Sequence, residues 1–124
     1  MSIASLVMVV DGNPTSRHTV SGMLKHLGYN RLVEVDDGET VCDRLRETGA
    51  EVVVCDRFVH DMSGLDILDR VRADRELGET PFIMIFQPRD RAGIIEGTRR
   101  GLTSYLVSPF RAMDLADKLS RILD

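Results

Sequence analysis

Five short apolar runs divide the chain. They are LVMVV at residues 6–10, RLVEV at 31–35, VVVC at 52–55, FIMIF at 82–86 and SYLV at 104–107. Their enrichment in β-branched residues predicts five strands, and the segments between them space their apolar residues as helices do. Alternating strands and helices indicate a parallel sheet with helices on both faces. Runs that are apolar at every position belong in the buried interior of such a sheet.

Capping residues mark the boundaries of the helices. Asn13 can cap the first helix, Pro14 suits its first turn, and Gly28 ends it. Four further helices follow from the same spacing, at about residues 38–48, after Ser63, before Gly101 and at 111–123. No internal repeat or low-complexity segment interrupts the pattern, so residues 1–124 are expected to form one domain.

The composition is that of a soluble globular protein, with 43% hydrophobic and 29% charged residues. The apolar runs are too short to cross a bilayer, and residues 1–10 lack the features of a signal peptide, so we expect a cytoplasmic protein without membrane contact. A net charge of −4 disfavours direct binding to DNA. Cys42 and Cys55 lie in apolar patterns without metal-ligand spacing, which indicates reduced, buried side chains.

Two aspartates mark the place where chemistry is expected. Ligands of open parallel sheets gather at the carboxyl ends of the strands, where Asp11 and Asp56 follow the first and third strands. Those strands are neighbours in a doubly wound sheet, so both carboxylates would face one crevice. Such a pair repels itself unless a cation or a proton compensates, and Mg²⁺ with oxygen ligands is the usual solution. Phosphoryl transfer to a carboxylate needs this arrangement, because one aspartate is the nucleophile while the metal neutralises phosphoryl charge.

The order and spacing of these features resemble those of CheY-like response-regulator receiver domains. The resemblance rests on the five strand-helix units, VVD ending the first strand, VVVCD ending the third, the glycine of DMSGLDIL, and YLVSPF. It covers the whole chain and implies a three-layer α/β/α sandwich with a five-stranded parallel sheet in the flavodoxin-like order 2-1-3-4-5. It also implies two-component phosphorelay signalling, with a sensor histidine kinase or a histidine phosphotransfer protein as partner.

The resemblance gives four residues expected roles. Asp56 matches the aspartate that accepts the phosphoryl group, and Asp11 matches one of two acids that organise Mg²⁺. Phe58 falls where the family uses a backbone carbonyl as a metal ligand, and Tyr105 matches the aromatic residue that changes position on activation. The fourth helix, fifth strand and fifth helix correspond to the face that contacts an output protein. No output domain follows the fifth helix, so a single-domain regulator or a receiver cut from a longer protein is expected.

Three positions depart from the family pattern. Gly12 stands where the second acid is expected, Phe86 where a serine or threonine donates to the phosphoryl group, and Ser108 where a lysine pairs with it. Losing a carboxylate should weaken or abolish Mg²⁺ binding. A phenyl ring has no donor and would crowd its place, holding Tyr105 in one orientation, and a hydroxyl lacks the charge of lysine. We therefore expect at most weak phosphoacceptor or autodephosphorylation activity.

Basic residues near the expected site have ordinary interpretations as well as chemical ones. Arg57 and Arg89 could supply the missing positive charge, although solvated loop arginines are the commoner case. His60 could assist hydrolysis, but a loop histidine without a visible partner is more often idle. The arginines in the second half of the chain most simply form a solvated face, and an anion or acidic-partner site is the sharper interpretation.

Two functions from different classes remain open. In the first, Asp56 still accepts a phosphoryl group. In the second, the chain is a pseudo-receiver, a protein-interaction or anionic-ligand-binding module that needs no phosphorylation. Asp11 and Asp56 favour the first, whereas Gly12, Phe86 and Ser108 favour the second. A flavodoxin-type cofactor binder would share the sheet order, but the aspartate of DGNPTSR would repel the cofactor's phosphate.

Overall fold

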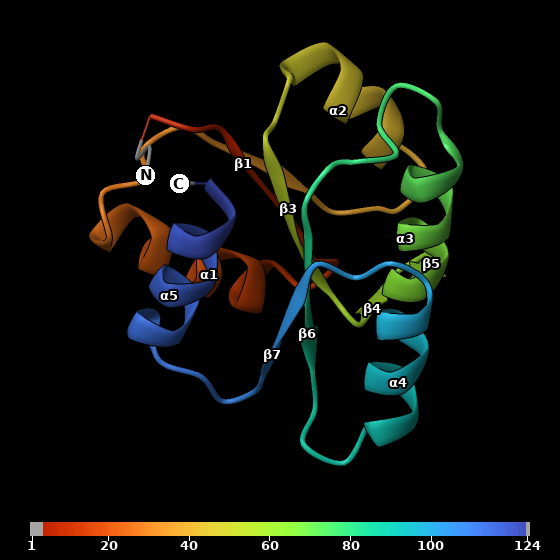
Figure 1. Cartoon of the computed structure of the whole chain (residues 1–124). Helices are drawn as coiled ribbons and strands as arrows, with labels where there is room; N and C mark the ends of the chain where they lie inside the picture. The colour runs from red at the N-terminus through yellow and green to blue at the C-terminus, as the bar shows by residue number, and fades with distance from the viewer. Residues whose placement is uncertain (1–3, 124) are drawn as a thin grey trace.

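The computed structural model describes residues 4–123, so the expectations for the first three residues and for residue 124 lie outside the described residues. The main strands are β1 (Val7–Val10), β2 (Leu32–Val35), β3 (Val52–Asp56), β6 (Phe82–Phe86) and β7 (Ser104–Val107). They form one parallel sheet in the order β2-β1-β3-β6-β7 (Figure 1). The predicted order 2-1-3-4-5 is confirmed, with β6 and β7 as the fourth and fifth strands.

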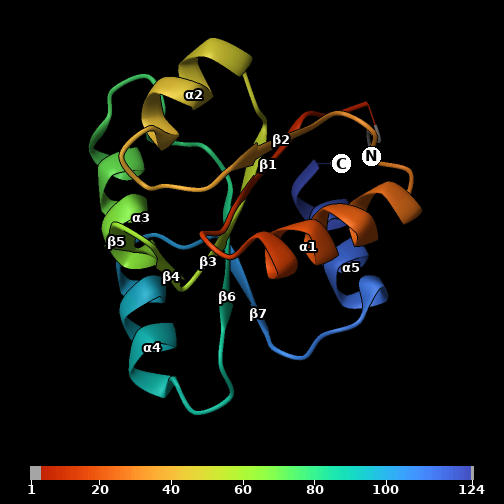
Figure 2. The same ribbon diagram turned by 180° about the vertical axis from the view of Figure 1, so that it is seen from behind.

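Helices cover both faces of this sheet (Figures 1 and 2). One face carries α1 (Pro14–His26) and α5 (Ala112–Leu123), and the other carries α2 (Val41–Thr48), α3 (Gly64–Ala73) and α4 (Arg91–Arg99). The predicted three-layer sandwich is therefore confirmed. Because α1 follows β1 and α5 follows β7, both helices begin at the carboxyl edge of the sheet.

Two apolar clusters fill the spaces between the layers. Neighbouring strand residues belong to different clusters: Val10 packs with α2 and α3, whereas Val9 packs with α1 and α5. In β6 the same alternation sends Phe86 into the first cluster and Ile85 into the second. A strand turns successive side chains to opposite faces, so a sheet covered on both sides needs apolar residues at every position.

The predicted caps hold the helices in place. The Asn13 side chain accepts hydrogen bonds from the backbone N–H groups of Thr15 and Ser16 at the start of α1. Ser63 accepts one from Asp66 at the start of α3. The second helix begins at Val41, a few residues later than the spacing predicts. Within residues 4–123, no helix is long and apolar enough to cross a membrane.

The sequence pattern does not predict the short hairpin that follows β3. Its strands are β4 (Phe58–Val59) and β5 (Met62–Ser63), which pair antiparallel. Between them, the Asp61 carboxylate accepts hydrogen bonds from the backbone N–H groups of Gly38 and Glu39, at 2.7 and 3.0 Å. The hairpin is thereby tied to the loop before α2. Strands of two residues are too short to produce a recognisable period of hydrophobic residues.

Candidate functional site

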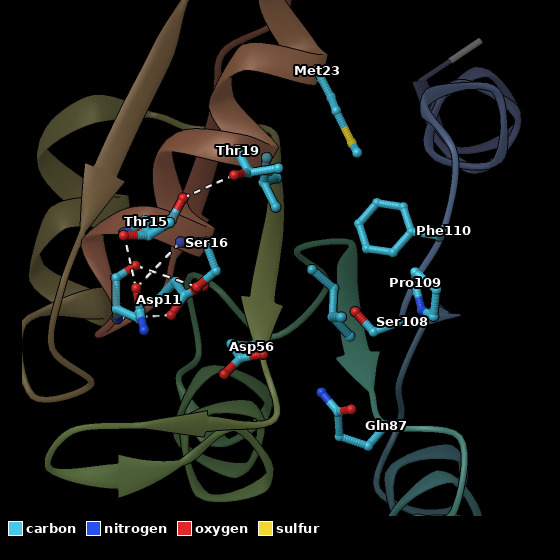
Figure 3. A pocket seen from close by; sticks show the side chains of 13 residues that line it. Asp11, Thr15, Ser16, Thr19, Met23, Asp56, Gln87, Ser108, Pro109 and Phe110 are labelled. Carbon is cyan, nitrogen blue, oxygen red and sulfur yellow. Dashed lines mark hydrogen bonds between the residues drawn. The ribbon is translucent and has the colours of Figure 1, made fainter.

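Asp11 and Asp56 lie at neighbouring places on the carboxyl edge of the sheet. Val10 of β1 pairs with Cys55 of β3, and the residues that directly follow this pair are Asp11 and Asp56. Both side chains line one cavity of about 520 Å³ between α1 and the loop that follows β7 (Figure 3). The structure therefore brings the two carboxylates to one crevice, as the strand order predicts.

The carboxylate of Asp11 is buried and held by the start of α1. Only 5% of the residue is exposed. One carboxylate oxygen accepts a hydrogen bond from the backbone N–H of Asn13 at 2.9 Å, and the other accepts one from the Ser16 hydroxyl. Its backbone carbonyl accepts a further bond from the Arg17 guanidinium at 2.9 Å. These donors fix the direction of the carboxylate, but the two that reach it are neutral.

The carboxylate of Asp56 carries a charge that its surroundings oppose. Burial raises the pKa of Asp56, and repulsion by Asp11 raises it further. Hydrogen bonds from the backbone N–H groups of Phe58 and Arg57 act in the opposite direction and stabilise the ionised form. A cation beside the two aspartates would offset both the cost of burying the Asp56 charge and its repulsion by Asp11.

The residues that could hold a divalent cation are few. Within residues 4–123, no group of three or more His, Cys, Asp or Glu side chains is arranged to hold a metal ion. The available anionic ligands are the two carboxylates of Asp11 and Asp56, whose mutual repulsion a hard cation would offset. Mg²⁺ prefers six oxygen ligands and keeps several waters, so this pair fits the ion without enclosing it.

Gly12 lies against the hairpin and leaves no room for a side chain. A Cβ atom at this position would lie 2.8 Å from a ring carbon of His60 and 2.9 Å from its backbone nitrogen. The close approach therefore involves the backbone of the hairpin as well as a side chain that could turn away. His60 is therefore a packing partner of Gly12, a contact that nothing in the sequence indicates.

Phe86 does not crowd the cavity. Its side chain is fully buried, and it packs in the cluster under α3 and α4 because its position in β6 turns it to that face. The prediction that its ring occupies the phosphoryl place is therefore wrong in geometry. The ring meets Tyr105 edge to face, with centroids 6.0 Å apart and an interplanar angle of 82°. Tyr105 is 40% exposed, and the Lys118 ammonium lies 6.0 Å from its ring.

Arg57 does not line the cavity and is held by other residues. Its Nε atom donates to an Asp90 carboxylate oxygen at 2.8 Å, and its guanidinium lies 4.3 Å from the centre of the Phe58 ring. Only 16% of the Arg57 side chain is exposed, so its interpretation as a solvated loop arginine is wrong. Asp90 also caps α4 by accepting from the backbone N–H of Gly93 at 3.0 Å. Arg89, in contrast, is exposed.

Most arginines of the second half are paired with acids, as a balanced surface predicts. Arg99 lies 3.6 Å from Glu96, and Arg111 lies 3.9 Å from Asp114. Arg100 pairs with Asp69 at 3.0 Å and with Glu96 at 3.8 Å. These pairings support the solvated face over a dedicated anion site. Both cysteines are free, with Cys55 buried and Cys42 partly buried.

Two segments far apart in the sequence form the walls of the cavity, and the sequence pattern does not indicate that they meet. One is a stripe of α1 that runs from Thr15 past Thr19 to Met23, and the other is the segment from Ser108 to Phe110 (Figure 3). The α1 residues recur every four positions, which places them on one side of a helix. That spacing is the only signal in the sequence, and it resembles an ordinary half-buried stripe. None of the described residues that line the cavity is lysine or arginine.

The chain is similar in sequence to chemotaxis proteins of bacteria. The chain is 37% identical over 118 residues to the chemotaxis protein CheY-3 of Vibrio cholerae, covering 95% of this chain and 91% of that protein. It is 33% identical over 118 residues to the chemotaxis protein CheY of Pseudomonas aeruginosa, covering 95% of each chain.

Solved structures also match the fold of this chain. The chemotaxis response regulator CheY4 of Vibrio cholerae superposes with a TM-score of 0.84 at 26% identity, covering 95% of this chain and 98% of that one. The receiver domain of the sensor histidine kinase PA1611 from Pseudomonas aeruginosa superposes with a TM-score of 0.87 at 22% identity, covering 97% and 98%. Residues 7–120 match the model of the response regulator receiver domain. The chain therefore belongs to the response regulator receiver domain family, the CheY-like modules of two-component signalling.

Proposed function

We propose that Asp56 accepts a phosphoryl group from a phosphohistidine of a sensor histidine kinase or a histidine phosphotransfer protein. The observation that carries the proposal is the placement of Asp56, at the carboxyl end of β3, half-buried and lining an accessible cavity beside Asp11. A receiver domain implies a histidine kinase partner. The single-domain organisation and the cytoplasmic location stay predictions from the sequence.

In the proposed reaction, a carboxylate oxygen of Asp56 attacks the phosphorus atom. An O–P bond forms to Asp56 as the N–P bond of the phosphohistidine breaks, and the imidazole keeps the electron pair of that bond. The Phe58 and Arg57 N–H groups stabilise the ionised carboxylate, and Ser16 and Asn13 hold Asp11 beside it. Positioning of this kind carries most of phosphoryl-transfer catalysis.

Asp11, Asp56 and the backbone carbonyl of Phe58 would hold a Mg²⁺ ion in this mechanism. The bound ion would neutralise negative charge on the transferred phosphoryl group. The receiver domain of PA1611 was crystallised with a magnesium ion coordinated in its active-site cleft. We expect weak binding here, because Gly12 offers no carboxylate and His60 packs against it.

The phosphoryl-transfer activity is proposed to be slow. A phosphoryl group on Asp56 would face cavity walls that carry a hydroxyl at Ser108 and an amide at Gln87, but no ammonium or guanidinium. Arg57 is paired with Asp90 and stacked on Phe58, so it is not free to turn toward that group. Preorganised positive charge is usually a large part of such catalysis, and its absence should cost orders of magnitude in rate.

Incubation with acetyl phosphate and Mg²⁺, followed by intact-mass measurement, tests the proposal. We expect the wild-type chain to gain the mass of one phosphoryl group and Asp56→Asn to gain none. Asp117→Asn is the matched control, because this aspartate is exposed on α5 and pairs with Arg121, away from the cavity lining. No gain in the wild type at saturating donor, or an equal gain in Asp56→Asn, would contradict the proposal.

A second candidate function is a pseudo-receiver that acts through protein contacts alone. It is favoured by three exposed apolar side chains on the expected output face, namely Ile95 of α4, Tyr105 of β7 and Met113 of α5. Met113 is 72% exposed and Ile95 59%. Phe86 packs edge-on against Tyr105, so we propose that Tyr105 keeps one orientation whether or not Asp56 is modified. A structure with a phosphoryl mimic in which Tyr105 has turned inward would contradict that part.

A further inference from the structure

The cavity beside Asp56 has the size and shape of a small-molecule site. Its volume of about 520 Å³ lies within the roughly 300–1,000 Å³ range of ligand pockets. Along α1 it extends from Thr15 to Met23, which is about 12 Å at the rise of an α-helix. Asp56 lies toward one end of this length and Met23 toward the other (Figure 3). A phosphoryl group or a metal ion at Asp56 would use only one end of such a space.

The charge at the Asp56 end favours a cation over an anion as a resident ligand. Asp11 and Asp56 are the only charged side chains among the described residues that line the cavity. Burial and mutual repulsion already oppose the ionised form of Asp56. An anionic ligand would add to that repulsion, whereas a cation would offset it. The hydroxyl of Ser108 and the amide of Gln87 lie near this end and can accept hydrogen bonds from a cationic donor (Figure 3).

The opposite end of the cavity is apolar. Met23 of α1 and Phe110 line this end, and Val20 and Ile85 add further apolar surface to the cavity. Figure 3 shows Met23 and Phe110 on the two walls, with the space between them. Burial of methylene groups against such side chains is favourable by roughly 25 cal/mol per Å² of apolar surface. A hydrated inorganic cation gains nothing from these residues, but an organic cation with an apolar stem would contact both ends.

We propose that this cavity binds a primary alkylammonium ion, with the ammonium group between Asp56 and Asp11 and the alkyl stem along Val20, Met23 and Phe110. The binding goes beyond the proposed phosphoryl transfer and does not need Asp56 to be phosphorylated. An ammonium group supplies three donors and a full positive charge, which none of the described lining residues offers. A bound amine would therefore also place a cation next to any phosphoryl group that Asp56 accepts.

Titration of the unphosphorylated chain with hexylamine, in buffer free of divalent cations and phosphodonor, tests the inference. Binding is followed by amide chemical shifts in two-dimensional ¹H–¹⁵N NMR spectra. We expect the largest shifts in residues 15–23 and 108–110. Hexanol has the same stem without charge, and methylamine has the charge without the stem. Both should bind at least about tenfold more weakly than hexylamine, because each loses one of the two contacts.

Substitutions in the cavity test which residues contact the ammonium group and which contact the alkyl stem. Asp56→Asn should weaken hexylamine binding by about tenfold and leave hexanol binding unchanged. Met23→Ala should weaken both ligands to a similar extent, and Asp117→Asn should change neither. Equal affinity for hexylamine and hexanol, full hexylamine affinity in Asp56→Asn, or shifts outside the two walls would overturn the inference. Because no phosphodonor is present, failure here leaves the mass test of Asp56 phosphorylation unaffected.

Discussion

Asp56 lies between two regions that differ in packing and in charge, both at the carboxyl edge of the sheet. On the hairpin side, which we define by Gly12, Arg57, His60 and Asp90, the chain is closely packed and its charges are paired. The cavity side, formed by residues 15–23 and 108–110, is open and has no positive charge in its described lining. Both sides meet the same carboxylate. The comparison indicates that the local positive charge, on Arg57, stabilises the fold, while the side that a phosphoryl group on Asp56 would face lacks it.

The largest expected stability effect on the hairpin side comes from Asp90→Ala. The change removes the α4 cap and leaves the mostly buried Arg57 guanidinium without its carboxylate partner. We expect a loss of about 2 kcal/mol in the free energy of unfolding, measured by urea denaturation. Asp117→Ala, which breaks an exposed pair with Arg121, should cost about 0.5 kcal/mol or less. Similar costs for the two variants would contradict the distinction between a structural and a surface arginine.

A pair of glycine substitutions tests the close packing of the hairpin side. Gly12→Ala should destabilise the chain by about 1–2 kcal/mol, because its Cβ would collide with His60. Gly22→Ala, in the exposed middle of α1, meets no atom within 4 Å and should stabilise by about 1 kcal/mol. Opposite signs in thermal or urea unfolding are the expected result. A neutral Gly12→Ala would mean that the hairpin moves away freely, and that Gly12→Asp could then restore an acid without penalty.

A smaller effect is expected in the pH dependence of stability, where Asp61 of the hairpin and Asp56 should contribute with opposite signs. Hydrogen bonds from Gly38 and Glu39 hold the pKa of Asp61 below its ordinary value, so its contribution is present at neutral pH and is lost as the pH falls toward that lowered pKa. The pKa of Asp56 is raised, so the folded state binds its proton more tightly than the unfolded chain does. Stability is therefore lost as the pH rises from the ordinary pKa of aspartate through the raised pKa of Asp56.

The midpoints of urea unfolding, measured at several pH values from mildly acidic to neutral, check both predicted pH dependences. Compared with the wild type, Asp56→Asn should be more stable above the raised pKa of Asp56, because it removes a repelled buried charge. Asp61→Asn should be less stable at neutral pH and should approach the wild type in acid. Parallel curves for the three proteins would show that neither carboxylate is coupled to folding.

The sequence predicts the fold well because the fold depends on local periodicity. The five apolar runs, the caps Asn13 and Ser63, and the neighbouring Asp11 and Asp56 all follow from patterns within short segments. The hairpin side depends instead on contacts across the fold. Arg57 and Asp90 are 33 positions apart, and the fit of Gly12 against His60 needs the backbone path of both segments. No periodicity in either segment indicates these contacts.

Phe86 shows a different limit of the sequence argument. The resemblance places Phe86 where the family has a hydrogen-bond donor, but a match of positions does not give the direction of a different side chain. The alternation along β6 turns the ring into the core, where an apolar side chain is stable, and away from the cavity. The cavity side consequently stays open, which the expectation of a crowded site did not foresee.

The central claim is that Asp56 is a usable phosphoacceptor whose rate is limited by the missing positive charge on the cavity side. The most direct test is the rate of Asp56-dependent phosphorylation by acetyl phosphate and Mg²⁺ in Ser108→Lys compared with the wild type, followed by intact mass. Ser108 lines the open cavity, so a lysine there has space to reach the phosphoryl group. We predict an increase of about tenfold or more. A folded Ser108→Lys variant that is phosphorylated no faster than the wild type would contradict the account.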